Sequence, residues 1–245
     1  MRSTAQRKVR KLARRAIPFL VPAHRWYLEW SYATRTRSRE RLFTSIYRSN
    51  QWGDPASVSG GGSNLEQTAA LRSALPQALA SLGVRSLLDA QCGDYHWMQH
   101  VDLELERYIG GDIVDDLVGR LKGKYGGPGR EFLRIDVAKD PLPRVDAILS
   151  RDCLVHFSFR QIAATISNFQ RSGAVYLLTT TFTDRESNRD IITGDWRTLN
   201  PCAPPLNWPE PVMVINEGCT QSGSTYADKS IGIWELASLP SGPQP

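Results

Sequence analysis

The sequence predicts an α/β protein built on a doubly wound, mostly parallel sheet that ends in an antiparallel hairpin. Five short, nearly continuous apolar runs are typical of strands buried on both faces: 86–90, 108–113, 132–137, 145–151 and 174–182. The segments between them leave room for crossover helices, and strands that alternate with helices imply a parallel sheet. Two further apolar runs, 211–220 and 230–239, flank a turn rich in Gly and Ser and are expected to form the hairpin. The predicted sheet therefore has seven strands.

The size and composition fit one folded domain. The chain has 245 residues, of which 41% are hydrophobic and 22% are charged, so a disordered, collagen-like or coiled-coil chain is excluded. Its longest apolar runs are far shorter than the roughly 20 residues of a membrane-spanning helix. We expect a basic, aromatic-rich N-terminal arm with helices over 1–50, the main domain over 51–239 and a disordered tail over 240–245.

The positive charge is concentrated in the N-terminal arm. Residues 1–41 hold 12 Lys and Arg against two acids, whereas the rest of the chain holds 18 basic and 23 acidic residues. Within the arm, residues 7–20 are predicted to form a basic amphipathic helix. This helix could contact an anionic membrane surface, bind RNA, serve as an organelle transit peptide, or be a solvated tail that packs on the body.

The remaining segments before the sheet are expected to be helices and a loop. Residues 26–50 are predicted to be helical, with Trp26, Trp30 and Phe43 facing the core. The glycine-rich loop over 50–63 allows close approach of backbone to a ligand. Ser63 and Glu66 have the spacing of a capping box, which predicts that a helix begins there and that Pro76 kinks or splits it.

The four cysteines are scattered, and no pair of them has the spacing of a zinc site. We interpret them as reduced thiols of a cytoplasmic protein, with peripheral membrane contact through residues 7–20 left open.

Acidic residues stand at the end of each of the first four strands. Ligands of an open parallel sheet bind beyond the carboxyl ends of its strands, where LLDAQCGDYHWM, GGDI, RIDV and SRDCLVHF lie. A nicotinamide or flavin site requires three spaced glycines for a pyrophosphate, whereas only Gly93 is present. The site is therefore expected to bind a neutral or cationic ligand.

The segment LLDAQCGDYHWM resembles the first motif of the class I S-adenosylmethionine-dependent methyltransferases, whose usual form is Asp-x-Gly-x-Gly-x-Gly. Asp112 stands 23 residues after Asp89, as the ribose-binding acid of that superfamily would. Together with WGDPASVSGGGS, YIGGDIV, SRDCLVHFS, YLLTTTF and DIITGDWRTLN, the motif resembles a bacterial group often encountered beside glycan-building genes. The resemblance implies a Rossmann-like methyltransferase fold and S-adenosylmethionine as the cofactor.

The resemblance also assigns cofactor-binding residues. Asp112 would accept from the ribose hydroxyls, and Asp89 with the backbone at Gly93 would hold the amino-acid end. Ordinary capping or surface roles for these acids remain alternatives. The full set of implied cofactor-binding residues is Asp89, Gln91, Cys92, Gly93, Asp112, Ile113, Asp136, Val137 and Arg151, of which Ile113, Asp136 and Val137 would border the adenine. Gln91 and Tyr95 replace two motif glycines, so Tyr95 would have to point away from the cofactor.

Two catalytic residues are predicted after the fourth strand, and a segment that covers the substrate is predicted after the fifth. His156 is the predicted general base, and Asp152, four residues earlier, would orient its ring on a helical turn. A structural role for His156 is the alternative, and a metal site is not expected because a third ligand is lacking. The connection after the fifth strand would bind a polar acceptor through Asn188, Arg189, Trp196 and Arg197, or simply cover the sheet edge.

The predicted activity is methyl transfer from S-adenosylmethionine to an oxygen of a small molecule or glycan. Two rival hypotheses remain. One is RNA methylation that uses the basic arm, although the acidic body disfavours nucleic acid. The other is a non-catalytic scaffold or regulator, suggested by the replaced glycines. The oligomeric state is left open.

Overall fold

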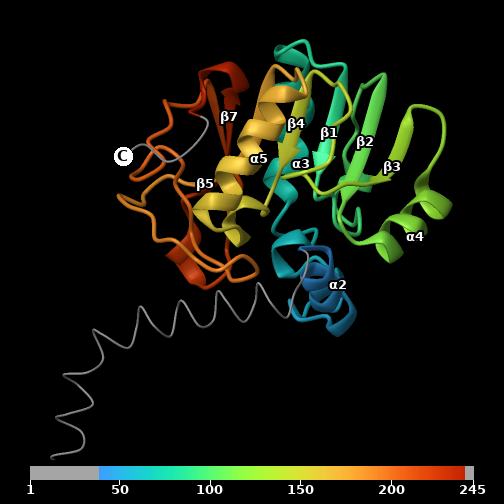
Figure 1. Cartoon of the computed structure of the whole chain (residues 1–245), viewed down its shortest axis with the longest axis horizontal. Helices are drawn as coiled ribbons and strands as arrows, with labels where there is room; N and C mark the ends of the chain where they lie inside the picture. The colour runs from blue at the N-terminus through green and yellow to red at the C-terminus, as the bar shows by residue number, and fades with distance from the viewer. Residues whose placement is uncertain (1–38, 241–245) are drawn as a thin grey trace, which may run out of the picture. The chain divides into compact units, whose positions relative to one another are not determined.

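A computed structural model describes residues 39–240 of the chain (Figure 1). The predicted basic helix over 7–20, Trp26, Trp30 and the tail after Pro240 lie outside the described residues. Contacts divide the chain into two compact units, 1–42 and 43–245, and apart from residues 39–42 everything discussed below belongs to the second unit.

Seven strands form one sheet in the order β3-β2-β1-β4-β5-β7-β6. Their bounds are β1 Ser86–Ala90, β2 Arg107–Asp112, β3 Arg130–Arg134, β4 Ala147–Ser150, β5 Tyr176–Phe182, β6 Met213–Asn216 and β7 Lys229–Glu235. Strands β1 to β5 are parallel, and β7 pairs antiparallel with both β5 and β6. The predicted mostly parallel sheet with a terminal hairpin is confirmed.

The α-helices of the described chain are α2 Arg39–Ser49, α3 Ala69–Ser81, α4 Asp115–Tyr125 and α5 Phe159–Arg171. Their end residues follow from helix electrostatics and capping. Helix α4 has Asp115 and Asp116 in its first turn and Lys122 and Lys124 in its last turn, which complement the helix dipole. The Ser158 side chain caps α5 by accepting a backbone N–H of its first turn.

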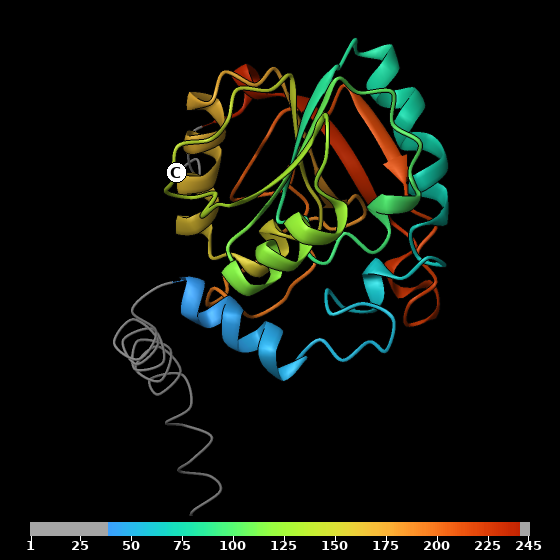
Figure 2. The ribbon, with the colours of Figure 1, turned by 90° about the vertical axis from the view of Figure 1, so that its right-hand side faces the viewer.

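Helices cover both faces of the sheet, with α3 and α5 on opposite sides (Figure 2). Because side chains of a strand alternate between faces, Leu87 of β1 packs with α3 and α4, whereas Leu88 packs with α5. Each fully buried leucine of this kind contributes about 1.5–3 kcal/mol to folding. Phe43 of α2 packs on Phe157 with a ring separation of 6.1 Å, so its predicted core orientation is confirmed.

The connections differ from the simple strand–helix alternation that the sequence predicted. The β1–β2 connection holds only a 3₁₀ turn, Met98–His100, and the described β3–β4 connection has no helix. The latter contains Pro141 and Pro143, which cannot donate the hydrogen bonds of a helix interior. Strand β3 also begins and ends earlier than the predicted run 132–137.

The predicted capping box is wrong. Ser63 ends a 3₁₀ turn, and α3 begins only at Ala69. Between them, the Asn64 carboxamide oxygen accepts the Gln67 N–H at 2.9 Å, which forms a separate turn. Pro76 lies inside α3 without splitting it.

Candidate functional site

The strand order reverses between β1 and β4, so the segments after these strands border the usual ligand position of an open α/β sheet. Gln91 and Gly93 follow β1, Asp112 ends β2, and Arg151 and Asp152 follow β4. The topology therefore brings the predicted cofactor and catalytic residues to one edge of the sheet.

The loop after β1 keeps a glycine-like backbone although two of its glycines are replaced. The φ angles of Gln91, Gly93 and Tyr95 are 63°, 55° and 61°, all in the left-handed region. This conformation costs a non-glycine residue on the order of 1–3 kcal/mol and is found preferentially at functional sites. The Gln91 side-chain oxygen is buried and lacks a hydrogen-bond partner within the described residues.

Packing explains why side chains are tolerated in this loop. Tyr95 points into the core, as expected, where its ring lies 5.4 Å from that of Tyr108 and 5.3 Å from that of Phe132. Cys92 is also buried, and a Cβ atom added to Gly110 would lie 3.1 Å from its sulfur. Burial raises the pKa of the Cys92 thiol well above its usual range, so Cys92 packs rather than acting as a nucleophile.

Asp112 joins the ends of β1 and β2. Its carboxylate accepts the backbone N–H of Gly93 at 3.3 Å and that of Val114 at 2.9 Å. Burial raises the pKa of Asp112 to about 6, while these hydrogen bonds oppose the rise. Since each carboxylate oxygen can accept two hydrogen bonds, capacity remains for a ligand hydroxyl. The neighbouring Ile113 is buried on the face of α3 and α4.

Asp89 lies inside β1 and is buried with 3% of its surface exposed. It accepts a hydrogen bond from the Tyr108 hydroxyl at 2.7 Å. Burial raises its pKa to about 7, and the Tyr108 hydrogen bond opposes that rise. Its assignment to the amino-acid end of the cofactor stays a prediction.

We expect Asp89→Asn to stabilise the protein above pH 7. The folded protein holds this proton between about pH 4 and 7 whereas the unfolded chain does not, so stability falls as the pH rises through that window. The pKa rise corresponds to a maximum of about 4 kcal/mol, which the neutral amide would recover at pH 8. Urea unfolding of both proteins at pH 4 and 8 measures this. Equal stability differences at the two pH values would contradict it.

Asp136 and Val137 lie after β3. The Asp136 carboxylate accepts the Ala138 N–H at 3.2 Å and so shapes a turn. Val137 is buried on the α5 face, and its carbonyl accepts from the Asn168 side chain at 2.9 Å. Their predicted place beside the adenine stays a prediction.

The glycine-rich loop is fastened to the motif loop by Asp94. The Asp94 carboxylate accepts hydrogen bonds from the Ser57 hydroxyl, the Val58 N–H and the Ser59 hydroxyl at 3.0–3.2 Å. Ser59 accepts the Asp94 N–H at 3.1 Å in return. This contact was not predicted, although the loop was expected to approach a ligand. The loop therefore lies directly beside the motif of β1.

We expect Gly93→Ala to destabilise the protein by about 1–3 kcal/mol and to loosen residues 57–63. An added Cβ atom would lie 2.1 Å from the Ser59 hydroxyl, and φ at this position is left-handed. Gly119→Ala is the matched control, because nothing lies within 4 Å of its added Cβ inside α4, and it should stabilise by about 0.5–1 kcal/mol. Thermal unfolding and limited proteolysis measure both effects. A Gly93→Ala protein as stable as the parent would contradict the contact.

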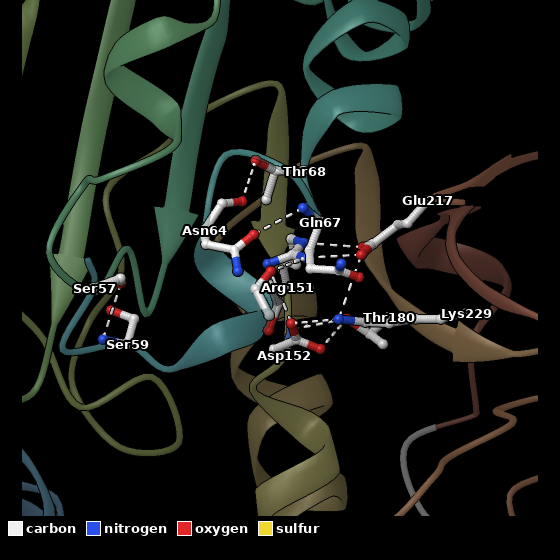
Figure 3. A network of polar contacts seen from close by, with 12 residues as sticks. Ser57, Ser59, Asn64, Gln67, Thr68, Arg151, Asp152, Thr180, Glu217 and Lys229 are labelled. Atoms are coloured by element: carbon white, nitrogen blue, oxygen red, sulfur yellow. Dashed lines mark hydrogen bonds and ion pairs between the residues drawn. The ribbon is translucent and has the colours of Figure 1, made fainter. Parts of the chain in front are cut away.

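Four buried or half-buried charges form a network at the end of β4 (Figure 3). Arg151 donates to both oxygens of Glu217 at 2.9 and 2.7 Å, and also to the Gly62 carbonyl at 2.8 Å. Lys229 lies 2.7 Å from an Asp152 oxygen and 3.3 Å from a Glu217 oxygen. Although burial opposes it, the charges of Glu217 and Asp152 raise the pKa of Arg151. Two cations and two anions therefore balance.

This network changes the interpretation of Arg151. Its guanidinium contacts Glu217, the Gly62 carbonyl and Asp152, so it holds the glycine-rich loop against the sheet, and its assignment to the cofactor stays a prediction. Glu217 and Lys229 could not be predicted from the ends of the parallel strands, because they lie at the two sides of the hairpin turn. In the sequence, Glu217 lies near the end of one of the last two apolar runs, and Lys229 comes directly before the other. Two opposite charges on either side of the predicted hairpin turn are the signal that could have indicated them.

His156 lies in the 3₁₀ turn Leu154–His156 after β4. Its Nδ1 is 2.9 Å from the Asp195 carbonyl oxygen. A carbonyl can only accept, so Nδ1 carries the proton and Nε2 is left as an acceptor. Burial lowers the pKa of His156 below its ordinary value, which keeps the ring neutral at pH 7.

The predicted role of Asp152 in orienting His156 is therefore wrong. The ring is bonded to Asp195, whereas the Asp152 carboxylate is bonded to Lys229. Asp152 has a φ of 52°, so the helical spacing assumed for residues 152 and 156 does not exist. Burial alone would raise the pKa of Asp152, but the charges of Lys229 and Arg151 lower it below its usual range.

A cavity of about 560 Å³ adjoins His156. Its lining residues are Trp52, Ser59, Gly60, Gly61, Gly62, Asp152, His156, Phe182, Trp196, Cys219, Gln221, Ser222, Tyr226 and Lys229. The Trp52 ring lies 5.1 Å from that of His156, and Trp196 packs edge-on against Phe182 and Tyr226. Trp196 is 42% exposed and lines this cavity, and its predicted role as a stacking surface stays a prediction.

The other predicted substrate residues do not line this cavity. The Asn188 amide donates to the carbonyls of Asn200 and Ala203 at 2.8 and 3.0 Å and so ties the covering segment together. Arg189 is exposed and is not among the lining residues. For these residues, the alternative of a structural cover describes the structure better than substrate binding does.

Arg197 is a structural cation. It is 1% exposed, and its guanidinium donates to the carbonyls of Val155 and Phe157, on both sides of His156, at 3.3 and 2.8 Å. Burial lowers its pKa to about 10. Arg197 therefore fixes the turn that carries His156.

None of the described helices has the length and apolar character needed to cross a membrane. No group of three or more His, Cys, Asp or Glu side chains in residues 39–240 could hold a metal ion.

Comparisons with known proteins identify the fold. No protein-family model and no curated protein matched the sequence. A methyltransferase from Clostridium acetobutylicum, described as S-adenosylmethionine-dependent, has a similar structure with a TM-score of 0.51, 8% identity and coverage of 71% of this chain and 92% of that chain. Human N-acetylserotonin methyltransferase, solved with S-adenosylmethionine, has a TM-score of 0.50, 14% identity and coverage of 83% and 61%.

The chain therefore has the fold of the class I S-adenosylmethionine-dependent methyltransferases, as the sequence resemblance implied. It spans 61% of the length of the human enzyme and 66% of that of the methyltransferase domain of bacterial CtHen1-C.

Proposed function

We propose that this protein transfers a methyl group from S-adenosylmethionine to a hydroxyl oxygen of a small molecule or glycan. The observation that carries the proposal is the neutral His156 at the cavity, with Nδ1 bonded to Asp195 and Nε2 left as an acceptor. A base of this kind is needed for an oxygen acceptor, because the hydroxyl must lose its proton.

The residues at the β1 and β2 ends fit the proposed cofactor. Gln91 offers a buried oxygen without a partner in the described chain, which suits the ammonium group of an amino-acid moiety. Asp112 suits the ribose hydroxyls, as a carboxylate with remaining acceptor capacity. When bound, S-adenosylmethionine would supply an electrophilic methyl group on a sulfonium.

The protein's own contribution is orientation and proton removal. The cavity would hold the acceptor, and His156 Nε2 would take the hydroxyl proton as the oxygen attacks. Fixing two reactants in attack geometry supplies about 7–11 kcal/mol of the barrier. Arg197 and Asp195 would keep the ring in place, since both bond to the His156 turn or to the ring itself.

We expect Asp112→Ala to weaken S-adenosylmethionine binding at least tenfold, a loss of about 1.4 kcal/mol or more. Isothermal titration calorimetry with the cofactor and its demethylated product measures this. Asp116→Ala on the exposed surface of α4 is the matched control and should leave affinity unchanged. If the intact protein binds neither molecule, the fold stands but the enzyme proposal fails.

The backbone of the motif loop argues against a non-catalytic scaffold. That hypothesis was based on the replacement of two glycines, whereas Gln91 and Tyr95 retain left-handed φ angles. The RNA hypothesis depends on the basic helix predicted over residues 7–20 of the arm, which lies outside the described residues.

A further inference from the structure

We propose that the cavity beside His156 binds a neutral sugar ring, and that Asp152 and Lys229 hold two adjacent hydroxyl groups of that ring. The proposal deepens the proposed function by naming the class of acceptor, and it rests on that function only for the methyl transfer itself. Three properties of the cavity wall support it: its charge, its unused hydrogen-bonding groups and its aromatic surfaces.

The charge of the wall favours a neutral ligand. Of the described lining residues, Asp152 and Lys229 are the ones that are charged at pH 7, and they neutralise each other at 2.7 Å. Behind them, Arg151 and Glu217 are a second balanced pair. An anionic ligand would meet the Asp152 carboxylate without finding an uncommitted cation, so phosphates and carboxylates are disfavoured.

The pair still offers one donor and one acceptor side by side. Within residues 39–240, the Lys229 ammonium has three N–H groups, of which one donates to Asp152 and at most one more is directed to Glu217. The second Asp152 oxygen is contacted only weakly, by the Thr180 hydroxyl at 3.4 Å. One ligand hydroxyl can therefore donate to Asp152 while its neighbour accepts from Lys229, which is the pattern of a vicinal diol.

The glycines of the loop leave this pair accessible. A Cβ atom on Gly62 would lie 3.4 Å from the Asp152 oxygen that is bonded to Lys229, and 3.5 Å from the Lys229 nitrogen. A larger side chain at Gly62 would thus cover the pair. The φ angle of Gly62 is outside the left-handed region, so its backbone permits such a side chain.

The aromatic walls match the apolar face of a sugar. Trp52 and Trp196, both more than a third exposed, line the cavity together with Phe182 and Tyr226. Trp52 also stacks on His156, which leaves the edge of the imidazole to meet a hydroxyl. Flat rings supply contact area at low entropic cost, and hydroxyl groups at the ring's edge reach the polar pair.

Calorimetric titration tests the proposal. The probes are the methyl glycosides of glucose, galactose and mannose, with glucuronic acid and glucose 6-phosphate as anionic counterparts. They are titrated into the protein with and without S-adenosylhomocysteine. At least one neutral glycoside should bind with a Kd below about 1 mM, and its anionic counterpart at least tenfold more weakly. A deoxy analogue that lacks one hydroxyl of the diol should also bind at least tenfold more weakly.

Substitutions test the contributions of the aromatic walls and of the Asp152–Lys229 pair to glycoside binding separately. Trp196→Ala should weaken glycoside binding at least tenfold, and Trp196→Phe should retain most of it. Gly62→Val should abolish glycoside binding, leave the unfolding temperature close to that of the parent and keep the affinity for S-adenosylhomocysteine within twofold of the parent. Tighter binding of the anionic sugars, binding of none of the glycosides, or binding insensitive to both sites would overturn the proposal. Failure of S-adenosylhomocysteine to bind would instead overturn the proposed function.

Discussion

Replacing His156 by Gln is expected to lower the rate of methyl transfer about 100- to 10,000-fold, the usual contribution of a positioned general base. Gln keeps a similar length and can still donate to the Asp195 carbonyl, so the fold of the turn should survive. What is lost is the neutral Nε2 that takes the hydroxyl proton. Transfer of a tritiated methyl group from S-adenosylmethionine to the acceptor measures the rate.

The pH dependence separates a base from a structural histidine. Because burial lowers the pKa of His156 below its ordinary value, the parent rate should hold at neutral pH and fall only in solutions more acidic than an ordinary histidine would require, as the ring becomes protonated. The variant should lack this acid limb. The same change at the exposed His100, which is not among the cavity-lining residues, should alter neither rate nor profile. An acid limb that persists in His156→Gln would assign it to another group.

The sheet could be predicted because its signals are local. The run at β1 has the same bounds in the sequence prediction and in the structure, since a strand buried on both faces must be almost wholly apolar. The acids at the strand ends followed from topology, because parallel strands bring their carboxyl ends to one edge. Asp112 and Asp89 therefore lie near the motif loop as expected.

The roles of charged residues could not be predicted in the same way. Lys229 pairs with Asp152 across 77 positions of sequence, and Glu217 pairs with Arg151 across 66, so spacing carries no signal for either contact. Arg197 was predicted to bind the acceptor because it lies in the polar connection after the fifth strand. It is buried because the carbonyls beside His156 need a donor there.

Local backbone geometry explains the error at Asp152. The i, i+4 rule applies only within a helix, and the left-handed residue at 152 interrupts the chain before the turn that carries His156. Such residues cost energy unless the surroundings hold them, as Lys229 and Thr180 hold Asp152.

Replacing Glu217 by Leu is expected to destabilise the protein by about 3–5 kcal/mol, because it leaves a buried cation without its partner. Glu217 is 2% exposed and receives two hydrogen bonds from Arg151. Replacing Arg151 by Met should cost a similar amount for the opposite reason, because it leaves an excess of negative charge. It also removes the bond to the Gly62 carbonyl, so the glycine-rich loop should become more sensitive to proteolysis.

The double variant distinguishes charge balance from packing. With both residues made apolar, Asp152 and Lys229 remain as a balanced pair, so the double variant should be more stable than the sum of the two single losses by about 2–3 kcal/mol. Urea unfolding of the four proteins provides the cycle. If the losses simply add, Arg151 and Glu217 act independently and the network does not stabilise the fold through their pairing. A positive coupling would show that the balanced charges beneath the cavity are one cooperative unit, so that any ligand recognised there meets a wall already fixed by the fold.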